Sequence, residues 1–179
     1  MSESKKPTVA TVWLDGCSGC HMSLLDMDER ILDIFTRSDL VYSPLVDFKD
    51  YPDEVDVCLV EGAVSNEDDL AKVKKVREHT KTLIAFGDCA VTSNVPGMRN
   101  PMGTEAVLER AYHENVTINP MTPTQVIPQL LPMAKPVHTV VDVDVFLPGC
   151  PPSADLIYTM LDDLLSGRVP EVVGSRFGR

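Results

Sequence analysis

The stretch TVATVWLDGCSGCH, residues 8–21, determines how the rest of the chain is interpreted. Its first half is apolar and β-branched, as expected of a buried strand. Directly behind it stand Cys17 and Cys20, each preceded by a glycine. A pair of thiols at the end of a strand suits a redox disulfide, a zinc site or half of an iron–sulfur site.

Composition narrows the class of protein. The 179 residues are enough for a single domain with its own core, which we expect to span residues 1–179. The 27 acidic and 16 basic residues give a net charge of −11, which repels nucleic acid and anionic lipid, so neither is an expected partner. No apolar run approaches the roughly 20 residues of a membrane span. The opening MSESKKPTVA has neither the apolar segment of a secretory signal nor paired arginines, so we expect a cytoplasmic location.

Apolar runs alternate with helical patterns along the chain. The expected strands are residues 8–14, 40–46, 55–62, 82–88 and 140–149. The expected helices are residues 21–36, 66–79, 104–112 and 153–165, the last opened by Ser153 as N-cap and closed by Gly167. Strands that alternate with helices predict an α/β fold with a parallel sheet covered on both faces.

Four of the five cysteines follow expected strands. Cys17 and Cys20 follow the first strand, Cys89 the fourth and Cys150 the fifth. Because the carboxyl ends of parallel strands share one edge of the sheet, these cysteines are expected to meet in one crevice. Glycines beside them would let the backbone approach a bulky inorganic group; they are Gly16, Gly19, Gly87 and Gly149.

An iron–sulfur site with four cysteines explains this pattern better than its alternatives. A thioredoxin-like disulfide between Cys17 and Cys20 leaves Cys89 and Cys150 without a role. Zinc sites usually draw two close pairs of ligands, whereas here one pair joins two single cysteines. The fifth cysteine, Cys58, lies inside the run VDVCLVEG and is expected to be a buried core residue.

Several polar residues adjoin the expected site. Glu61 ends the third strand and has four open roles: proton carrier, hydrogen-bond acceptor, extra ligand or solvated loop acid. His21 either neighbours the site or faces a partner. Asp15 and Asp88 flank cysteine loops, where turn acids are common, and are expected to be structural.

Apolar residues outside the strands have two expected roles. Met22 and Met27 lie in the first helical pattern and are expected to pack in the core. Residues 94–103 and the proline-rich residues 119–136 are expected to be surface loops, since proline resists both helix and strand. The second loop is also apolar, which favours a partner interface or a short helix packed on the domain.

The motifs VWLDGCSGCHMSLLD, FGDCAV and LPGCPPS, in this order and spacing, resemble the small subunit of [NiFe] hydrogenases. The resemblance is greatest to the short small subunit of cytoplasmic NAD-reducing (bidirectional) hydrogenases, and it covers nearly the whole chain. It implies a flavodoxin-like, doubly wound parallel sheet with one [4Fe–4S] cluster. The ligands that it implies are Cys17, Cys20, Cys89 and Cys150, in loops that contain Gly16, Gly19 and Gly149.

The resemblance further implies that the enzymatic activity is divided among subunits. The Ni–Fe site belongs to a separate large subunit, so no catalytic residue is expected on this chain, apart from a role for Glu61 in proton transfer or cluster tuning. Electrons would pass between that site and diaphorase subunits with FMN and further clusters, where NAD is reduced.

Two departures from related subunits refine this expectation. Longer small subunits carry a C-terminal region with two more clusters and a twin-arginine leader, so one cluster is expected here. The homologous subunit of NADH:quinone oxidoreductase has two adjacent cysteines in the first motif, unlike DGCSGC. That subunit and other short hydrogenase subunits remain alternatives within the same class. A zinc-stabilised scaffold without redox activity is the alternative from a different class.

Overall fold

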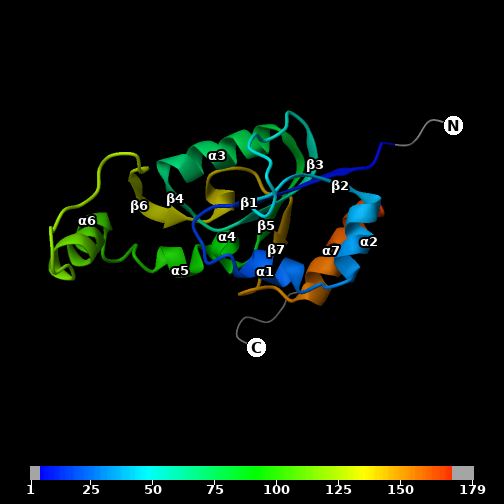
Figure 1. The fold of residues 1–179 in the computed structure, drawn as a ribbon. Helices are drawn as coiled ribbons and strands as arrows, with labels where there is room; N and C mark the ends of the chain where they lie inside the picture. Colours follow the sequence, from blue (N-terminus) through cyan, green and yellow to red (C-terminus); the bar gives the residue numbers. More distant parts are fainter. Residues whose placement is uncertain (1–4, 171–179) are drawn as a thin grey trace.

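A parallel sheet of five strands forms the centre of the computed structural model, which describes residues 5–170 (Figure 1). Its strand order is β2-β1-β3-β5-β7, and every neighbouring pair is parallel. Counted within this sheet, the order is 2-1-3-4-5, as in flavodoxin-like folds. The predicted flavodoxin-like α/β single domain is therefore confirmed, with the first four and last nine residues of the expected domain outside the described part.

The fold contains a main sheet, a small second sheet and the helices around them. The main sheet consists of β1 (Thr8–Trp13), β2 (Asp39–Tyr42), β3 (Val55–Glu61), β5 (Thr80–Phe86) and β7 (Val145–Leu147). A small antiparallel sheet pairs β4 (Val64–Asn66) with β6 (Leu130–Lys135). The α-helices are α1 (Gly19–Leu25), α2 (Arg30–Arg37), α3 (Glu67–Glu78), α4 (Asp88–Thr92), α5 (Asn94–Gly97), α6 (Thr104–Glu109) and α7 (Ala154–Leu165). A π-helical turn, η1, covers Arg110–Glu114, and a 3-10 turn, η2, covers Val137–Thr139.

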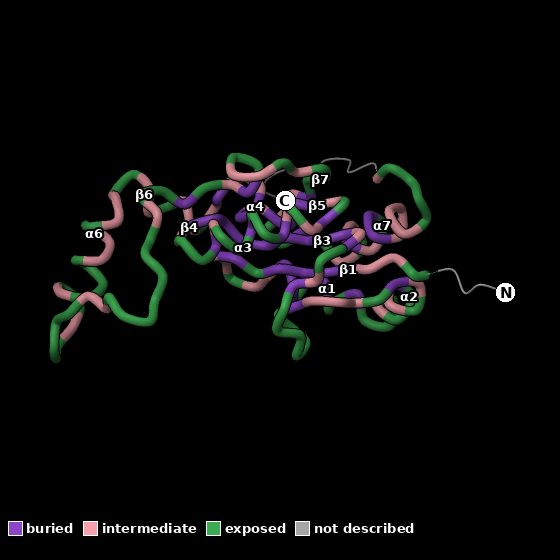
Figure 2. Tube along the Cα trace, turned by 90° about the horizontal axis from the view of Figure 1, so that it is seen from above, coloured by how far each residue is buried: buried purple, intermediate pink, exposed green. Residues whose placement is uncertain are grey.

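The core has two halves, one on each face of the main sheet. Along β3, Val57 and Leu59 face the half that α1, α2 and α7 cover, while Cys58 and Val60 face the half beneath α3 and α4. This alternation follows from the two-residue period of a strand, and both faces are buried, as Figure 2 shows. Cys58 is 0% exposed, so its predicted place in the core is confirmed.

The two longest helices both begin at side-chain caps, of which the one at Ser153 was predicted. The side chain of Asn66 accepts a 2.9 Å hydrogen bond from the backbone N–H of Asp69 at the start of α3. The Ser153 hydroxyl accepts one of 3.3 Å from the backbone N–H of Leu156 at the start of α7. Each cap satisfies an N–H that the first helical turn leaves free, which typically contributes about 1 kcal/mol.

The expected helix over residues 21–36 is wrong as a single element. It divides into α1 and α2, and Asp28 between them has a left-handed backbone with φ of 53°. The break lets α2 turn onto α7, where the guanidinium of Arg37 and the carboxylate of Asp162 form a 2.8 Å ion pair. Met27, at the break, is 1% exposed and packs in the core as predicted, but Met22 is 45% exposed and does not.

Three other expected boundaries also need correction. β2 ends four residues earlier than expected, and β7 covers only Val145–Leu147 of the expected 140–149 strand. The proline-rich residues 119–136 contain β6, although prolines were expected to prevent a strand. Pro132 is tolerated because the pairing of β6 with β4 is irregular between its two paired positions.

Residues 94–129 form an extension beyond the end of the main sheet. The expected helix over residues 104–112 is present as α6 continued by the π-helical turn η1. Figures 1 and 2 show α6 projecting away from the sheet, with largely exposed chain around it. Across residues 5–170, every helix is too short or too polar to cross a membrane.

Candidate metal centre

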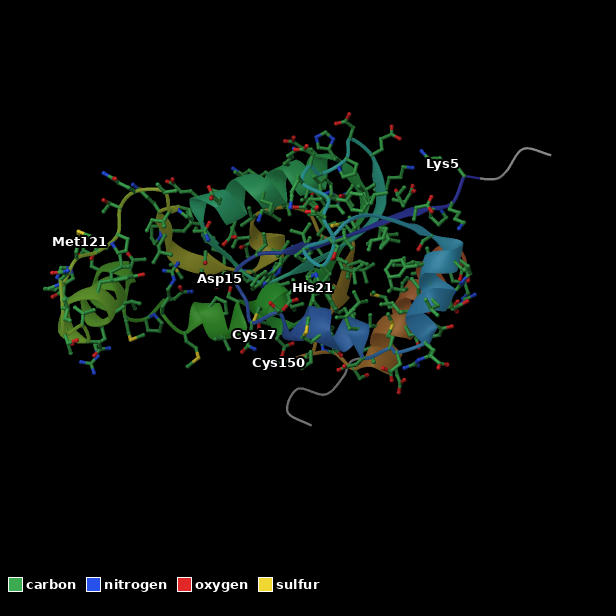
Figure 3. The ribbon with its side chains drawn as sticks, viewed as in Figure 1. Lys5, Asp15, Cys17, His21, Met121 and Cys150 are labelled. Carbon is green, nitrogen blue, oxygen red and sulfur yellow. The ribbon has the colours of Figure 1, made fainter. Side chains whose placement is uncertain are left out.

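The four cysteines expected to converge lie at the carboxyl edge of the main sheet. Cys17 follows β1, and Cys20 lies in the first turn of α1. Cys89 follows β5 at the start of α4, and Cys150 follows β7. Figure 3 shows the labelled Cys17 and Cys150 on the same side of the sheet, beside α1 and α4. The predicted convergence is therefore present, while metal binding by these residues stays a prediction.

Burial and mutual repulsion both disfavour free thiolates in this cluster of cysteines. Burial raises the pKa of the Cys20 thiol far above its usual value, and the charges of Glu61 and of the other three cysteines raise it further. Burial likewise raises the pKa of Cys89 to about 11, to which Cys17 and Cys150 contribute. Metal ions among the thiolates would offset this repulsion, so the donor set fits a metal group.

Glycines keep the space around the thiols free. A Cβ atom at Gly87, whose φ is +81°, would lie 2.1 Å from Sγ of Cys20. At Gly149, with φ of +141°, a Cβ would lie 2.5 Å from Cα of Pro152. At Gly19 it would lie 3.2 Å from Sγ of Cys17. At Gly87 the backbone thus approaches a thiol more closely than any other residue type would permit, whereas Gly149 is required by the tight turn at Pro152.

Asp88 joins the loops of Cys89 and Cys150. Its carboxylate accepts a 2.7 Å hydrogen bond from the backbone N–H of Gly149, and its own backbone N–H donates to the Gly149 carbonyl at 2.8 Å. The structural role expected for Asp88 agrees with these bonds. Asp15, on the other side, pairs with Ala63 and accepts a hydrogen bond from the Ser65 hydroxyl, which also agrees with a structural role.

Glu61 lies beneath the first cysteine pair and is 1% exposed, so a solvated loop acid is the wrong interpretation. Its carboxylate accepts hydrogen bonds from the backbone N–H groups of Cys20 at 3.3 Å and of His21 at 3.0 Å. It also contacts Nδ1 of the His21 ring. Among the open roles, the geometry supports a hydrogen-bond acceptor that fixes the start of α1.

His21 is 1% exposed, so it neighbours the cysteines and does not face a partner. Its Nε2 lies 3.0 Å from Oγ1 of Thr11, which donates a 2.7 Å hydrogen bond to the Ser43 hydroxyl. Glu61, His21, Thr11 and Ser43 thus form a buried polar chain from β3 to the loop after β2. No sequence pattern indicated this series of hydrogen-bonded side chains, since its members lie far apart in sequence.

Two further contacts, made by residues 94 and 99 of the extension, were not expected. The side-chain N–H of Asn94 donates a 3.4 Å hydrogen bond to Sγ of Cys150. Nη2 of Arg99 donates to the carbonyls of Ser65 and Leu131, both at 2.9 Å, which ties the extension to the small sheet. The one signal in the sequence was the expected surface loop NVPGMRNPMG, which does not specify either contact.

Four thiols can serve a single metal ion or a larger group that contains several. Within residues 5–170, no three His, Cys, Asp or Glu side chains are placed to hold a single metal ion. An iron–sulfur cubane carries its thiolates on separate iron atoms, at the corners of a larger group. Four converging thiols with glycine clearance fit a group of that kind.

Residues 17–164 match the family described as NADH ubiquinone oxidoreductase, 20 Kd subunit. The chain belongs to this family. Its similar relatives include hydrogenase subunits. It is 41% identical over 168 residues to the NAD-reducing hydrogenase HoxS subunit delta of Cupriavidus necator, covering 91% of this chain and 80% of that subunit. The predicted resemblance to the small subunit of NAD-reducing hydrogenases is thereby confirmed.

Other relatives are longer. The chain is 37% identical over 174 residues to a subunit of the F420-non-reducing hydrogenase of Methanothermobacter marburgensis, covering 94% of this chain. It spans 56% of the length of that relative. The activity, substrates and partners of the whole protein are therefore matters of proposal.

Solved structures with this fold include hydrogenases. A chain of an NAD+-reducing [NiFe]-hydrogenase in the H2-reduced state matches with a TM-score of 0.90 and 37% identity, covering 93% of this chain and 95% of that one. A chain of the [NiFeSe] hydrogenase of Desulfovibrio vulgaris Hildenborough matches with a TM-score of 0.60 at 18% identity, covering 91% and 60%. The second match concerns the fold alone.

Proposed function

We propose that this chain is the electron-transfer small subunit of a cytoplasmic [NiFe] hydrogenase. In this proposal Cys17, Cys20, Cys89 and Cys150 hold one [4Fe–4S] cluster. Electrons pass between a Ni–Fe site on a large subunit and a diaphorase module that carries FMN and further clusters and reduces NAD+. The observation that carries the proposal is the convergence of four cysteines from three strand ends on one sheet edge.

The residues around the cysteines serve to hold and shield such a group. When bound, a cluster of this type takes up and releases one electron at a time. Glu61 fixes the turn of Cys20 through backbone hydrogen bonds, and Asp88 fixes the loops of Cys89 and Cys150 against each other. Burial of Cys20 and Cys89 keeps water from one side of the site, while the exposed Cys17 and Cys150 leave the other side accessible to a partner.

An apolar surface at this edge supports a large-subunit partner. Trp13, Met22 and Leu25 are 44%, 45% and 44% exposed and lie beside the first cysteine pair, on β1 and α1. Exposed apolar side chains grouped in this way are typical of protein interfaces. In an assembly they would be buried together with the exposed thiols, so that the cluster lies close to the subunit that holds the Ni–Fe site.

The extension supports a second contact surface. Together with β6, as residues 94–136, it contains as many acidic as basic residues, so the whole net charge of −11 lies elsewhere in the chain. Exposed apolar side chains are frequent in the extension; they include Val95, Met98, Met102, Ile118, Met121, Val126 and Ile127. A nearly neutral, apolar projection suits burial against another subunit, for which the diaphorase module is the proposed occupant.

The test is hydrogen-dependent reduction of NAD+ by the complex purified anaerobically from its natural host. The proposal predicts reduction of NAD+ in the wild-type complex and its loss in Cys89→Ser, while the Ni–Fe subunit still exchanges hydrogen isotopes. Hydrogen-independent reduction of a quinone by NADH would instead favour the quinone oxidoreductase alternative. A complex with zinc and no iron at this subunit would favour the redox-inactive scaffold.

The relatives make other electron acceptors the second candidate. Identity to the methanogen subunit, 37%, is close to that with the NAD-reducing one, 41%. The same preparation should therefore be offered a viologen dye beside NAD+. Rapid dye reduction without any NAD+ reduction would assign a different acceptor and leave the electron-transfer role intact.

A further inference from the structure

One turn at the end of α4 approaches two of the cysteines. The side-chain N–H of Asn94 donates a 3.4 Å hydrogen bond to Sγ of Cys150. The neighbouring Val95 directs its backbone N–H at the Cys89 side chain; burial raises the pKa of that thiol, and this N–H acts to lower it. A single turn therefore supplies polar hydrogens to sulfur atoms that follow two different strands.

The turn is held in an unusual backbone conformation. Ser93 and Asn94 both have positive φ, 66° and 22°. Ser93 is 4% exposed; its backbone N–H donates to the Cys89 carbonyl at 3.1 Å, and its hydroxyl donates to the Ala134 carbonyl at 3.4 Å. Residues rarely adopt positive φ unless the surroundings require it, and asparagine is among the few that tolerate it. The surroundings thus fix the backbone from which the Asn94 side chain reaches Cys150.

We propose that Asn94 raises the reduction potential of the cluster by donating a hydrogen bond to the Cys150 thiolate. This inference rests on the proposed function, since it needs a cluster on these cysteines. Reduction adds negative charge to the cluster and its sulfur atoms, and a hydrogen bond to sulfur is stronger when that charge is larger. Asn94 therefore stabilises the reduced state more than the oxidised one.

Two substitutions remove the hydrogen-bond donor and are compatible with the backbone conformation at this position. Asn94→Gly deletes the amide at a position where positive φ suits glycine. Asn94→Asp keeps the shape of the side chain but replaces the donor by a negative charge. Asn119 provides matched controls, because it also has positive φ, 52°, and is exposed in the extension. Asn119 is two residues from Met121 in the sequence, and Figure 3 shows Met121 far from Cys17 and Cys150.

The experiment is a potentiometric titration of the purified complex followed by EPR, with iron counted in each sample. In Asn94→Gly we expect the ratio of reduced to oxidised cluster, at the wild-type midpoint, to fall about tenfold, which is about 59 mV for one electron. Asn94→Asp should shift further in the same direction. Asn119→Gly and Asn119→Asp should leave the midpoint and the iron content unchanged.

The outcomes separate this inference from the function on which it rests. A full complement of iron with a wild-type midpoint in both Asn94 variants overturns the inference and leaves the function standing. Loss of iron in both variants also overturns it, since Asn94 would then serve only to hold the site together. A wild-type subunit without iron overturns the function and the inference together.

Discussion

The carboxylate of Glu61, at the last position of β3, accepts a 3.0 Å hydrogen bond from the backbone N–H of His21 in the first turn of α1. The same carboxylate accepts a 3.3 Å bond from the N–H of Cys20. The end of one strand thereby fixes the helix that carries a proposed ligand. Because Glu61 is 1% exposed, water cannot take the place of either hydrogen bond if a substitution removes it.

Glu61→Gln should destabilise the fold. The amide that replaces one carboxylate oxygen is a donor, and it would face backbone N–H groups that are donors themselves. We expect a loss of about 1–3 kcal/mol in the free energy of unfolding, measured with denaturant, and weaker iron retention. Glu67→Gln, on the exposed first turn of α3, is the control and should change the free energy by less than about 0.5 kcal/mol. Equal effects of the two would contradict the role given to Glu61.

Gly87→Ala should prevent the metal site from forming. The new Cβ would lie 2.1 Å from Sγ of Cys20, in addition to the strain of an alanine at φ of +81°. Gly103→Ala is a matched control, since its φ is +80° and a Cβ there meets nothing within 4 Å. We expect the control to lose only about 1 kcal/mol of stability and to keep its iron. Iron lost equally from both variants would mean that backbone strain, and not the contact with Cys20, is responsible.

Cys58→Ser should keep the iron while weakening the fold. Cys58 is 0% exposed on the far half of the core from Cys20, and burial raises the pKa of its thiol to about 12. A hydroxyl there is costlier to bury than a thiol, by about 1–3 kcal/mol from mutational data. Unfolding and iron content are measured on the same sample. A loss of iron as complete as that in Cys89→Ser would mean that Cys58 is a ligand and not only a core residue.

Leu25→Asp should weaken assembly with the proposed large subunit. Leu25 is 44% exposed on α1, beside the cysteine edge, and a charge there would have to be desolvated at the interface. Leu32→Asp is the control, because Leu32 is 68% exposed and lies on α2, the helix that packs against α7. We expect at least a tenfold lower yield of large subunit on co-purification with Leu25→Asp and no change with Leu32→Asp. Equal yields would place the interface elsewhere.

The features that followed from the sequence are those governed by local pattern and chain direction. Apolar runs that alternate with helical patterns predicted the parallel sheet. The positions of Cys89 and Cys150 after strands predicted that these two cysteines meet at one edge of it. The helix cap at Ser153 also follows from side-chain chemistry close in sequence. Such features depend on few long-range contacts.

The features that did not follow depend on tertiary packing. Asp28 interrupts a continuous helical pattern so that α2 can pack on α7, and nothing local marks the break. Burial of Glu61 depends on amides that lie 40 and 41 residues away. The contact of Asn94 with Cys150 joins residues 56 positions apart. Periodicity within one element carries no information about partners at that separation.

The most direct test of the account is an iron count with low-temperature EPR on the anaerobically purified, dithionite-reduced complex, in wild type and in Cys89→Ser. We expect about four fewer irons per complex in the variant, together with the loss of one fast-relaxing S = 1/2 signal. Equal iron and identical spectra in the two samples, or zinc in place of iron at this subunit, would contradict it.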